Sequence, residues 1–187
     1  MGFMGGRQAF DDSIRLYVHA HANPALTAAM REISRFGAPA VLIAVALVMV
    51  ILLARAGRRR TAWLFAITVG GAEILEELLK LVFQRPRPVP FFGLAEPAGY
   101  SFPSGHATVS FAFFAALAVF VAPRRWLYFL GAALPVAAIG YSRIYLGVHY
   151  PSDVVGGYAA AAVWVFSVAW VGRLRRLRKP TLPAHSI

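Results

Sequence analysis

Residues 101–122 read SFPSGHATVSFAFFAALAVFVA, a short polar segment that runs directly into a long apolar one. The apolar part, residues 106–122, approaches the roughly 20 apolar residues that a helix needs to cross a bilayer. Four more segments of this kind occur, at residues 38–54, 61–83, 126–145 and 153–171. Backbone groups in lipid must be satisfied within their own segment, so each is expected to be helical. The sequence therefore predicts an all-α, polytopic membrane helix bundle with about five spanning helices.

The composition agrees with a membrane protein. Hydrophobic residues make up 59% of the 187 residues and charged residues only 14%, whereas soluble domains are nearer half apolar and a quarter charged. The net charge of +11 does not indicate nucleic acid binding, because the basic residues lie between apolar segments and leave no basic soluble face. The chain has no cysteine, which excludes disulfides and thiolate metal sites. The expected partner is the lipid bilayer.

The basic residues predict how the chain is oriented. They gather after the first, third and fifth apolar segments: Arg55, Arg58, Arg59, Arg60; Arg124, Arg125; Arg173, Arg175, Arg176, Arg178 and Lys179. A five-span zigzag places all three groups on one side, and the positive-inside rule makes that side cytoplasmic. The prediction is a multi-pass protein of the plasma (inner) membrane, with a spanning domain at residues 38–172 and a basic cytoplasmic tail at residues 173–187. Residues 84–105 and 144–152 are then extracytoplasmic.

The N-terminal segment, residues 1–37, differs from the apolar segments. Between residues 10 and 36 the apolar positions are interrupted by charges, and Asn23-Pro24 marks a turn with a short helix expected on each side. Such an amphipathic segment lies on a membrane surface more readily than it spans one. The segment is therefore predicted to be an interfacial lead-in to the first span. Tyr100, Tyr145 and Tyr150 are likewise expected to be interfacial aromatics rather than substrate contacts.

The second apolar segment carries charges where lipid makes them costly. Glu73, Glu76, Glu77 and Lys80 all fall within residues 61–83. Ionisable groups inside a span usually face a protein interior or a functional cavity. Glu76 and Glu77 lie four and three residues before Lys80, so either pair can meet on the helix surface. The pairing makes insertion tolerable or orients Lys80 towards a site, and both readings stay open.

Three clusters of chemically active residues flank the two extracytoplasmic connections. They are Lys80 with Arg87-Pro88; Pro103-Ser104-Gly105-His106; and Ser142-Arg143 with His149 and Asp153. The first two bracket residues 84–105 and the third brackets residues 144–152. Any strictly alternating topology puts these connections on the same side. The three clusters can therefore converge on one pocket.

This pocket suits a phosphate group. Lys80, Arg87 and Arg143 supply three cations, and arginine forks match the oxygens of phosphate. Ser104 and Gly105 stand at the expected N-terminus of the helix over residues 106–122. Free backbone N–H groups and the helix dipole bind anions at such a position.

The same pocket also holds groups able to act near neutral pH. His106 and His149 are two such groups. Asp153 falls in the first turn of the last span if that helix begins at Pro151, a residue suited to the first helical position. A carboxylate there can accept a hydrogen bond from one imidazole nitrogen. That bond fixes the tautomer and leaves the other nitrogen free to attack.

The constellation resembles the type-2 phosphatidic acid phosphatase family, whose pattern is Lys-x6-Arg-Pro, Pro-Ser-Gly-His and Ser-Arg-x5-His-x3-Asp. All eleven fixed positions are met: Lys80, Arg87, Pro88, Pro103, Ser104, Gly105, His106, Ser142, Arg143, His149 and Asp153. At about one chance in twenty per position, coincidence is negligible. Membrane members commonly have six spans, and this chain is expected to lack the first of them.

The resemblance implies a role for each residue. His149 attacks phosphorus, Asp153 orients it, and His106 protonates the leaving oxygen. The remaining residues hold the phosphate oxygens: Lys80, Arg87, Arg143, Ser104 and Gly105. Ser142 binds phosphate or supports the turn. Family members are typically metal-independent, so no metal and no cofactor is expected.

The predicted function is hydrolysis of a lipid phosphate at the extracytoplasmic face through a phosphohistidine. Polyprenyl diphosphate, phosphatidate and phosphatidylglycerol phosphate are the expected substrates. One alternative is a phosphotransferase that passes phosphate from His149 to an acceptor other than water. Another is a non-catalytic lipid-binding or transport protein on the same scaffold, although His106, His149 and Asp153 are all present.

Overall fold

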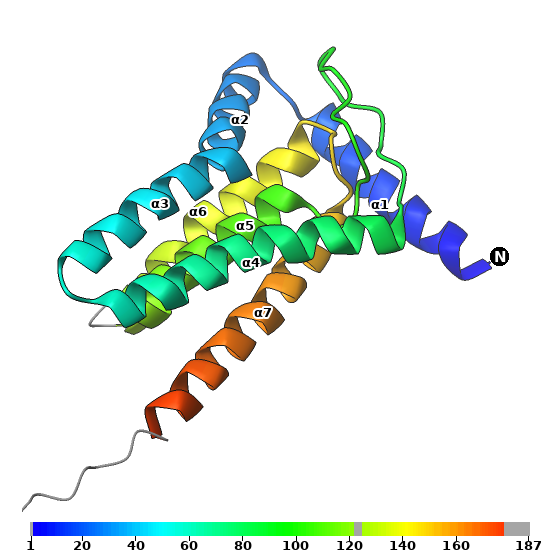
Figure 1. The fold of residues 1–187 in the computed structure, drawn as a ribbon. Helices are drawn as coiled ribbons and strands as arrows, with labels where there is room; N and C mark the ends of the chain where they lie inside the picture. Colours follow the sequence, from blue (N-terminus) through cyan, green and yellow to red (C-terminus); the bar gives the residue numbers. More distant parts are fainter. Residues whose placement is uncertain (1, 122–124, 178–187) are drawn as a thin grey trace, which may run out of the picture.

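The computed structural model describes residues 2–121 and 125–177, and these residues form helices without any strand. The prediction of an all-α fold is confirmed. The elements are α1 (Gly2–Ala20), α2 (Pro24–Phe36), α3 (Pro39–Arg55), α4 (Arg59–Phe83), α5 (Gly105–Ala116), the π-helical turn η1 (Leu117–Val121), α6 (Arg125–Tyr145) and α7 (Pro151–Leu177) (Figure 1). Each predicted apolar segment coincides with one helix, or with α5 and η1 together. Residues 122–124, which include Arg124 of the predicted cytoplasmic basic groups, and residues 178–187 of the basic tail lie outside the described residues.

Helix α5 lies at the centre of the bundle and packs against α3, α4, α6 and α7. Its core partners are apolar: Phe113 meets Phe65 of α4 edge to face, with ring centroids 5.7 Å apart. A glycine lets α7 approach closely. A Cβ built on Gly157 would lie 2.8 Å from Thr108 Oγ1 and 2.9 Å from the Ser104 carbonyl oxygen. The N-termini of α5 and α7 are therefore brought side by side.

Two long connections lie at the same end of the bundle as α1 (Figure 1). Residues 84–104 join α4 to α5, and residues 146–150 join α6 to α7. Gly147 has a φ of +75°, and a Cβ there would lie 2.6 Å from a Phe91 ring carbon, so the second connection can pass closely under the first. The Phe91 N–H donates to the Leu146 carbonyl at 3.0 Å.

Helix lengths test the predicted spans only in part. Among the described residues, Pro151–Leu174 is long and apolar enough to cross a bilayer, and α2 with α3 qualifies only as a pair bent by 46°. Helix α5 with η1 is apolar but shorter. Large apolar side chains are exposed on α3, α4 and α7, among them Leu47, Trp63 and Phe166. The topology with five spans stays a prediction.

The N-terminal segment forms two helices joined at Asn23, whose side chain caps α2 by accepting the Leu26 N–H at 2.9 Å. Both helices pack onto α6, and α1 also contacts α7. Tyr145, expected at the interface, is instead fully buried against this turn and exchanges a 2.8 Å hydrogen bond with Thr27. Tyr150 is also buried. Burial of these tyrosines follows from the position of α1 and α2, which cover the connections at this end.

Candidate active site

The structure brings the three sequence clusters to one end of the bundle. Lys80 lies in the last turn of α4 and Arg143 in the last turn of α6. Ser104 caps the N-terminus of α5, and Asp153 lies in the first turn of α7. Arg87 and His149 come from the two connections between these helices. The nine candidate site residues are Lys80, Arg87, Ser104, Gly105, His106, Ser142, Arg143, His149 and Asp153.

One ring nitrogen of His149 faces a cation and the other faces an anion. Nε2 lies 3.1 Å from Nη1 of Arg87, and Nδ1 lies 3.4 Å from Oδ2 of Asp153. An arginine can only donate, so Nε2 is the acceptor and the ring proton belongs on Nδ1. The Nδ1 proton then points at the carboxylate, with a longer separation than an ordinary hydrogen bond. The lone pair of Nε2 is directed at the cations.

The Asp153 carboxylate is fully buried and bonded on both oxygens. Oδ2 accepts the Ser101 hydroxyl and the Tyr150 N–H, the latter at 2.9 Å. Oδ1 accepts Nη1 of Arg85 at 2.6 Å. The bond from the Tyr150 N–H is one half of a capping box, because Tyr150 precedes the first helical residue, Pro151. The hydrogen bond that caps the start of helix α7 therefore also holds the Asp153 carboxylate in place.

The two site arginines are held by the elements around them. Arg87 donates to the carbonyls of Ala98, Gly99 and Val148, as well as to His149. Burial lowers the pKa of Arg87 below the ordinary arginine value, and it remains a cation at neutral pH.

Arg143 donates through Nη1 to the Ser34 hydroxyl of α2. Its Nε is buried and has no hydrogen-bond partner among residues 2–121 and 125–177. A buried, unpaired donor on a cation is costly and therefore suits an anionic ligand.

Lys80 forms ion pairs with both Glu76 and Glu77, the two glutamates that precede it on α4. Its Nζ lies 2.7 Å from Glu76 Oε1 and 2.9 Å from Glu77 Oε1. Glu76 is buried and also touches the Pro-Ser-Gly-His motif: a Cβ on Gly105 would lie 2.8 Å from its Oε1. Lys80 is thus placed beside the N-terminus of α5, while its charge is shared with two carboxylates.

The serines of the motifs differ in their bonding. The Ser104 hydroxyl is buried and has no hydrogen-bond partner in the described structure, which leaves it available to a ligand. The Ser142 hydroxyl donates to the Ile139 carbonyl of its own helix at 2.6 Å. Of the two readings left open for Ser142, this geometry favours support of the helix end over phosphate binding.

Burial dominates the titration of His149. It lowers the pKa to about 4, opposed by the nearby Asp153 carboxylate and helped by Arg143 and Arg87. The imidazole is therefore neutral at physiological pH. Arg143 and Arg87 oppose a positive charge on this ring and at the same time favour an anion beside it.

Four residues that touch the site belong to none of the motifs: Asp11, Ser34, Arg85 and Ser101. Ser101 and Arg85 bond Asp153, Asp11 bonds Arg85 at 2.8 Å, and Ser34 bonds Arg143. Arg85 is the first arginine of the run Arg85-Pro86-Arg87-Pro88, a repeat visible in the sequence. Asp11 carried no signal of this kind, because an acid on an amphipathic helix normally faces water.

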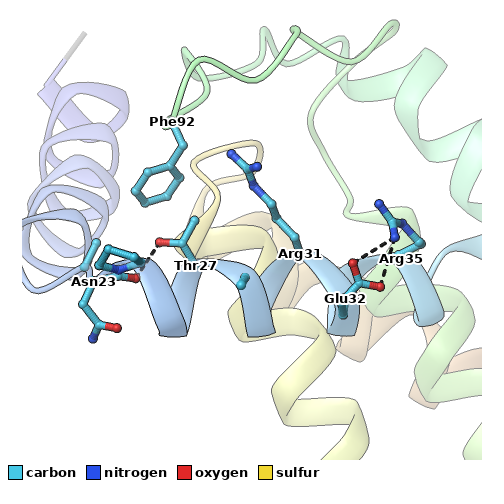
Figure 2. A pocket seen from close by; sticks show the side chains of 9 residues that line it. Asn23, Thr27, Arg31, Glu32, Arg35 and Phe92 are labelled. Carbon is cyan, nitrogen blue, oxygen red and sulfur yellow. Dashed lines mark hydrogen bonds and ion pairs between the residues drawn. The ribbon is translucent and has the colours of Figure 1, made fainter.

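A cavity of about 680 Å³ lies along the outer face of α2, beneath Phe92 of the connection between α4 and α5 (Figure 2). Arg31 and Arg35 both line it. Arg35 pairs with Glu32 at 2.8 Å, whereas Arg31 has no ion pair among the described residues. Arg31 and Ser34 are three apart on α2 and therefore neighbours on its surface. Arg31, which lines the cavity, therefore lies about one helical turn from Ser34, the residue that contacts Arg143.

A metal centre would require a group of ligands. In residues 2–121 and 125–177, no three histidine, aspartate or glutamate side chains gather in a way that would hold a metal ion. The site consists of cations, two imidazoles, the Asp153 carboxylate, which is already bonded on both oxygens, and the Glu76 and Glu77 carboxylates paired with Lys80.

Comparison with known proteins identifies the family. The model of the PAP2 superfamily matches residues 61–176. The chain is 28% identical to phosphatidylglycerophosphatase B of Bacillus subtilis over 92% of this chain and 88% of the relative. It is 28% identical to an undecaprenyl-diphosphatase of Sulfolobus acidocaldarius, over 87% of this chain and 79% of that protein. A decaprenylphosphoryl-5-phosphoribose phosphatase of Mycobacterium tuberculosis is 37% identical over 74% of this chain and 76% of its own.

The fold has solved counterparts. The crystal structure of a transmembrane PAP2-type phosphatidylglycerolphosphate phosphatase from Bacillus subtilis matches with a TM-score of 0.81 and 24% identity, over 94% of this chain and 89% of that one. Aquifex aeolicus LpxE matches with a TM-score of 0.61 and 22% identity, over 84% and 92%.

The chain belongs to the PAP2 superfamily. Like its relatives, it is a membrane phosphatase that acts on lipid phosphates. The resemblance seen in the sequence motifs is confirmed.

Proposed function

We propose that this phosphatase hydrolyses its lipid phosphate through a phosphohistidine on His149. The observation that carries the proposal is the placement of the His149 ring, with Nδ1 facing Asp153 and the Nε2 lone pair facing Arg87. This arrangement supports a neutral, oriented nucleophile beside a phosphate cage. Phosphoryl transfer depends mainly on positioning and electrostatics, so such a cage is sufficient.

In the first step Nε2 attacks phosphorus, and the bond from phosphorus to the lipid oxygen breaks. Lys80, Arg87 and Arg143 hold the equatorial oxygens as charge develops, together with the Ser104 hydroxyl and the Gly105 N–H. His106, in the first turn of α5, gives its proton to the leaving lipid oxygen. The products of this step are the free lipid hydroxyl, or lipid monophosphate from a diphosphate, and phosphohistidine.

In the second step His106, now neutral, takes a proton from a water molecule. The hydroxide attacks phosphorus, the bond to Nε2 breaks, and inorganic phosphate leaves. His149 returns to its neutral form with the Nδ1 proton directed at Asp153, and His106 is protonated again. The cycle needs no group beyond these side chains and water.

We further propose that the substrate carries a second anionic group beyond the phosphate that reacts. The support is the cavity on α2, which is lined by Arg31, a residue with no ion pair in the described part of the chain and three positions before Ser34, the partner of Arg143 (Figure 2). A polyprenyl diphosphate and phosphatidylglycerol phosphate both have such a group, whereas phosphatidate does not. Arginine forks bind phosphate oxygens in pairs, which suits this role.

The membrane arrangement is part of the proposal. Helices α3 to α7 cross the bilayer, the basic residues at the α3–α4 connection face the cytoplasm, and the site opens on the extracytoplasmic side. Exposed apolar side chains on α3, α4 and α7 support contact with lipid. The site then lies near headgroup depth, where an amphiphilic phosphate ester is accessible.

The experiment is phosphate release by the detergent-purified protein in excess chelator, with His149→Ala as the comparison. Release that persists in chelator and vanishes in the variant is the expected result. Release that needs an added metal ion, or that survives in His149→Ala, would contradict the mechanism.

A further inference from the structure

A buried carboxylate of α1 reaches the catalytic end of the bundle. The Asp11 side chain is 1% exposed. Its Oδ1 accepts the Ser152 backbone N–H at 2.9 Å, and its Oδ2 accepts the Ser152 hydroxyl at 2.5 Å and Nη2 of Arg85 at 2.8 Å. A carboxylate that leaves water is costly unless it is paired and hydrogen-bonded, and Asp11 is both. It therefore belongs to the interior of the protein, although α1 is an amphipathic helix.

Arg85 connects this carboxylate to the catalytic one. Its Nη1 donates to Asp153 Oδ1 at 2.6 Å and to the Ser152 hydroxyl at 2.7 Å, while its Nη2 holds Asp11. The guanidinium also lies 4.0 Å over the ring of Tyr150. The Tyr150 ring packs against the face of the Arg85 guanidinium, and the carboxylates of Asp11 and Asp153 bind its edges. These contacts together fix one orientation of the Arg85 side chain.

The network restrains Asp153 in two ways. With Oδ1 bound to Arg85, the carboxylate is held against rotation, so Oδ2 stays directed at Nδ1 of His149. Asp11 also caps α7 from outside the helix. Ser152 is the second helical residue, so its N–H has no partner within the helix, and a carboxylate is favourable there. The first turn of α7, which carries Asp153, is therefore anchored to α1.

We infer that Asp11 and Arg85 form a positioning pair, which orients the Asp153 carboxylate and through it the nucleophile His149. Helix α1 is then part of the catalytic apparatus as well as a surface segment. The inference rests on the proposed role of His149. Both residues act through Asp153.

The pair has a signature in the pH dependence of activity. His149 is faced by Asp153 of α7, Arg87 of the α4–α5 connection, Arg143 of α6 and His106 of α5. Arg85 neutralises part of the charge on Asp153. A neutral residue at position 85 leaves that carboxylate uncompensated, which favours a proton on His149. The acid limb of kcat/KM then moves to higher pH.

The test compares Arg85→Gln, Arg85→Lys and Asp11→Asn with Asp12→Asn as the matched control. Asp12 neighbours Asp11 on α1, but its side chain is 41% exposed and pairs with Arg15 of the same helix. We expect Arg85→Gln to lower kcat on the order of 10- to 100-fold with KM little changed, as for other residues that orient a catalytic ligand. Arg85→Lys keeps the charge and restores part of kcat and the original acid limb. Asp11→Asn lowers kcat less, and Asp12→Asn has wild-type activity.

Thermal unfolding in detergent separates positioning from folding. Wild-type kcat in Arg85→Gln would overturn the inference. So would a loss that merely follows the folded fraction and leaves the acid limb unmoved. His149→Ala, assayed alongside, distinguishes failure of the proposed function from failure of this inference. Activity remaining in that variant would contradict the proposed function itself. Activity that depends on His149 but not on Arg85 or Asp11 would contradict only the inference of a positioning pair.

Discussion

Arg87 Nη1 lies 3.1 Å from His149 Nε2, and this contact assigns the proton of the imidazole to the opposite nitrogen, Nδ1. The contact links the first motif of the sequence to the third. It also places a guanidinium where an attacked phosphoryl group would need charge neutralisation. The same arginine disfavours a positive charge on the ring, so in the proposed mechanism one side chain serves both His149 and the phosphoryl group that it attacks.

The pH profile reports this contact. Because the pKa of His149 is lowered to about 4, the nucleophile is neutral above that pH, and kcat/KM falls as pH drops through this value. In Arg87→Gln one cation is removed, the pKa of His149 rises, and the acid limb moves to higher pH. Arg87→Lys keeps the charge, so its acid limb stays near the wild-type position.

The measurement is kcat/KM across the acidic range for the three proteins with one lipid substrate. The ratio of variant to wild type cancels the ionisation of the substrate itself. An acid limb that is the same in Arg87→Gln and wild type would show that Arg87 does not act on His149.

Gly105 is predicted to tolerate no side chain. A Cβ at this position would lie 2.8 Å from Glu76 Oε1, so Gly105→Ala must displace the glutamate that holds Lys80 or the backbone N–H proposed to bind the phosphate. We expect a loss of kcat/KM on the order of 100-fold, the scale for losing one oxyanion donor. The loss is measured by steady-state phosphate release.

Gly70→Ala is the control for that substitution. Gly70 also lies inside a helix, α4, but a Cβ there would meet nothing within 4 Å. Alanine in a helix interior stabilises by about 0.5–1 kcal/mol relative to glycine, so this variant keeps full activity with an equal or higher Tm. Equal activity in Gly105→Ala and Gly70→Ala would contradict the close contact with Glu76.

Substrate choice tests Arg31. Removing a charged hydrogen-bond donor costs about 1.5 kcal/mol, so Arg31→Gln should raise KM roughly tenfold for lipids with a second anionic group. A polyprenyl diphosphate and phosphatidylglycerol phosphate represent that class, and KM for phosphatidate should stay unchanged. Arg35→Gln is the matched control, since Arg35 lines the same cavity but is already paired with Glu32. An equal rise for all three lipids would contradict the proposed headgroup contact.

Orientation is tested by labelling in intact cells. The chain has no cysteine, so an introduced one is unique. Ala95→Cys lies exposed in the α4–α5 connection and should react with an impermeant thiol reagent. Ala56→Cys, exposed in the α3–α4 connection, should react only after the cells are opened. The reverse pattern would place the site on the cytoplasmic side.

Much of this site was predictable because its chemistry is written in local motifs. Lys80, Ser104 and Asp153 lie near helix ends. The lengths of the apolar segments, and residues such as Pro151 that favour a helix start, predict where these ends fall. The contribution of α1 and α2 was not predictable. Asp11 and Ser34 reach the site across more than seventy residues of sequence, and their burial depends on where two amphipathic helices pack. The same packing buries Tyr145, which composition alone placed at the membrane surface.

The central claim is a covalent phosphohistidine at position 149, and trapping it is the most direct measurement. Detergent-purified protein is mixed with lipid labelled in the reacting phosphate and quenched rapidly in alkali, where phosphohistidine survives. The account predicts labelled protein whose label is released by acid, maps to the peptide containing His149, and is absent in His149→Ala. Label on another residue, or turnover in wild type with no labelled protein at any quench time, would contradict it.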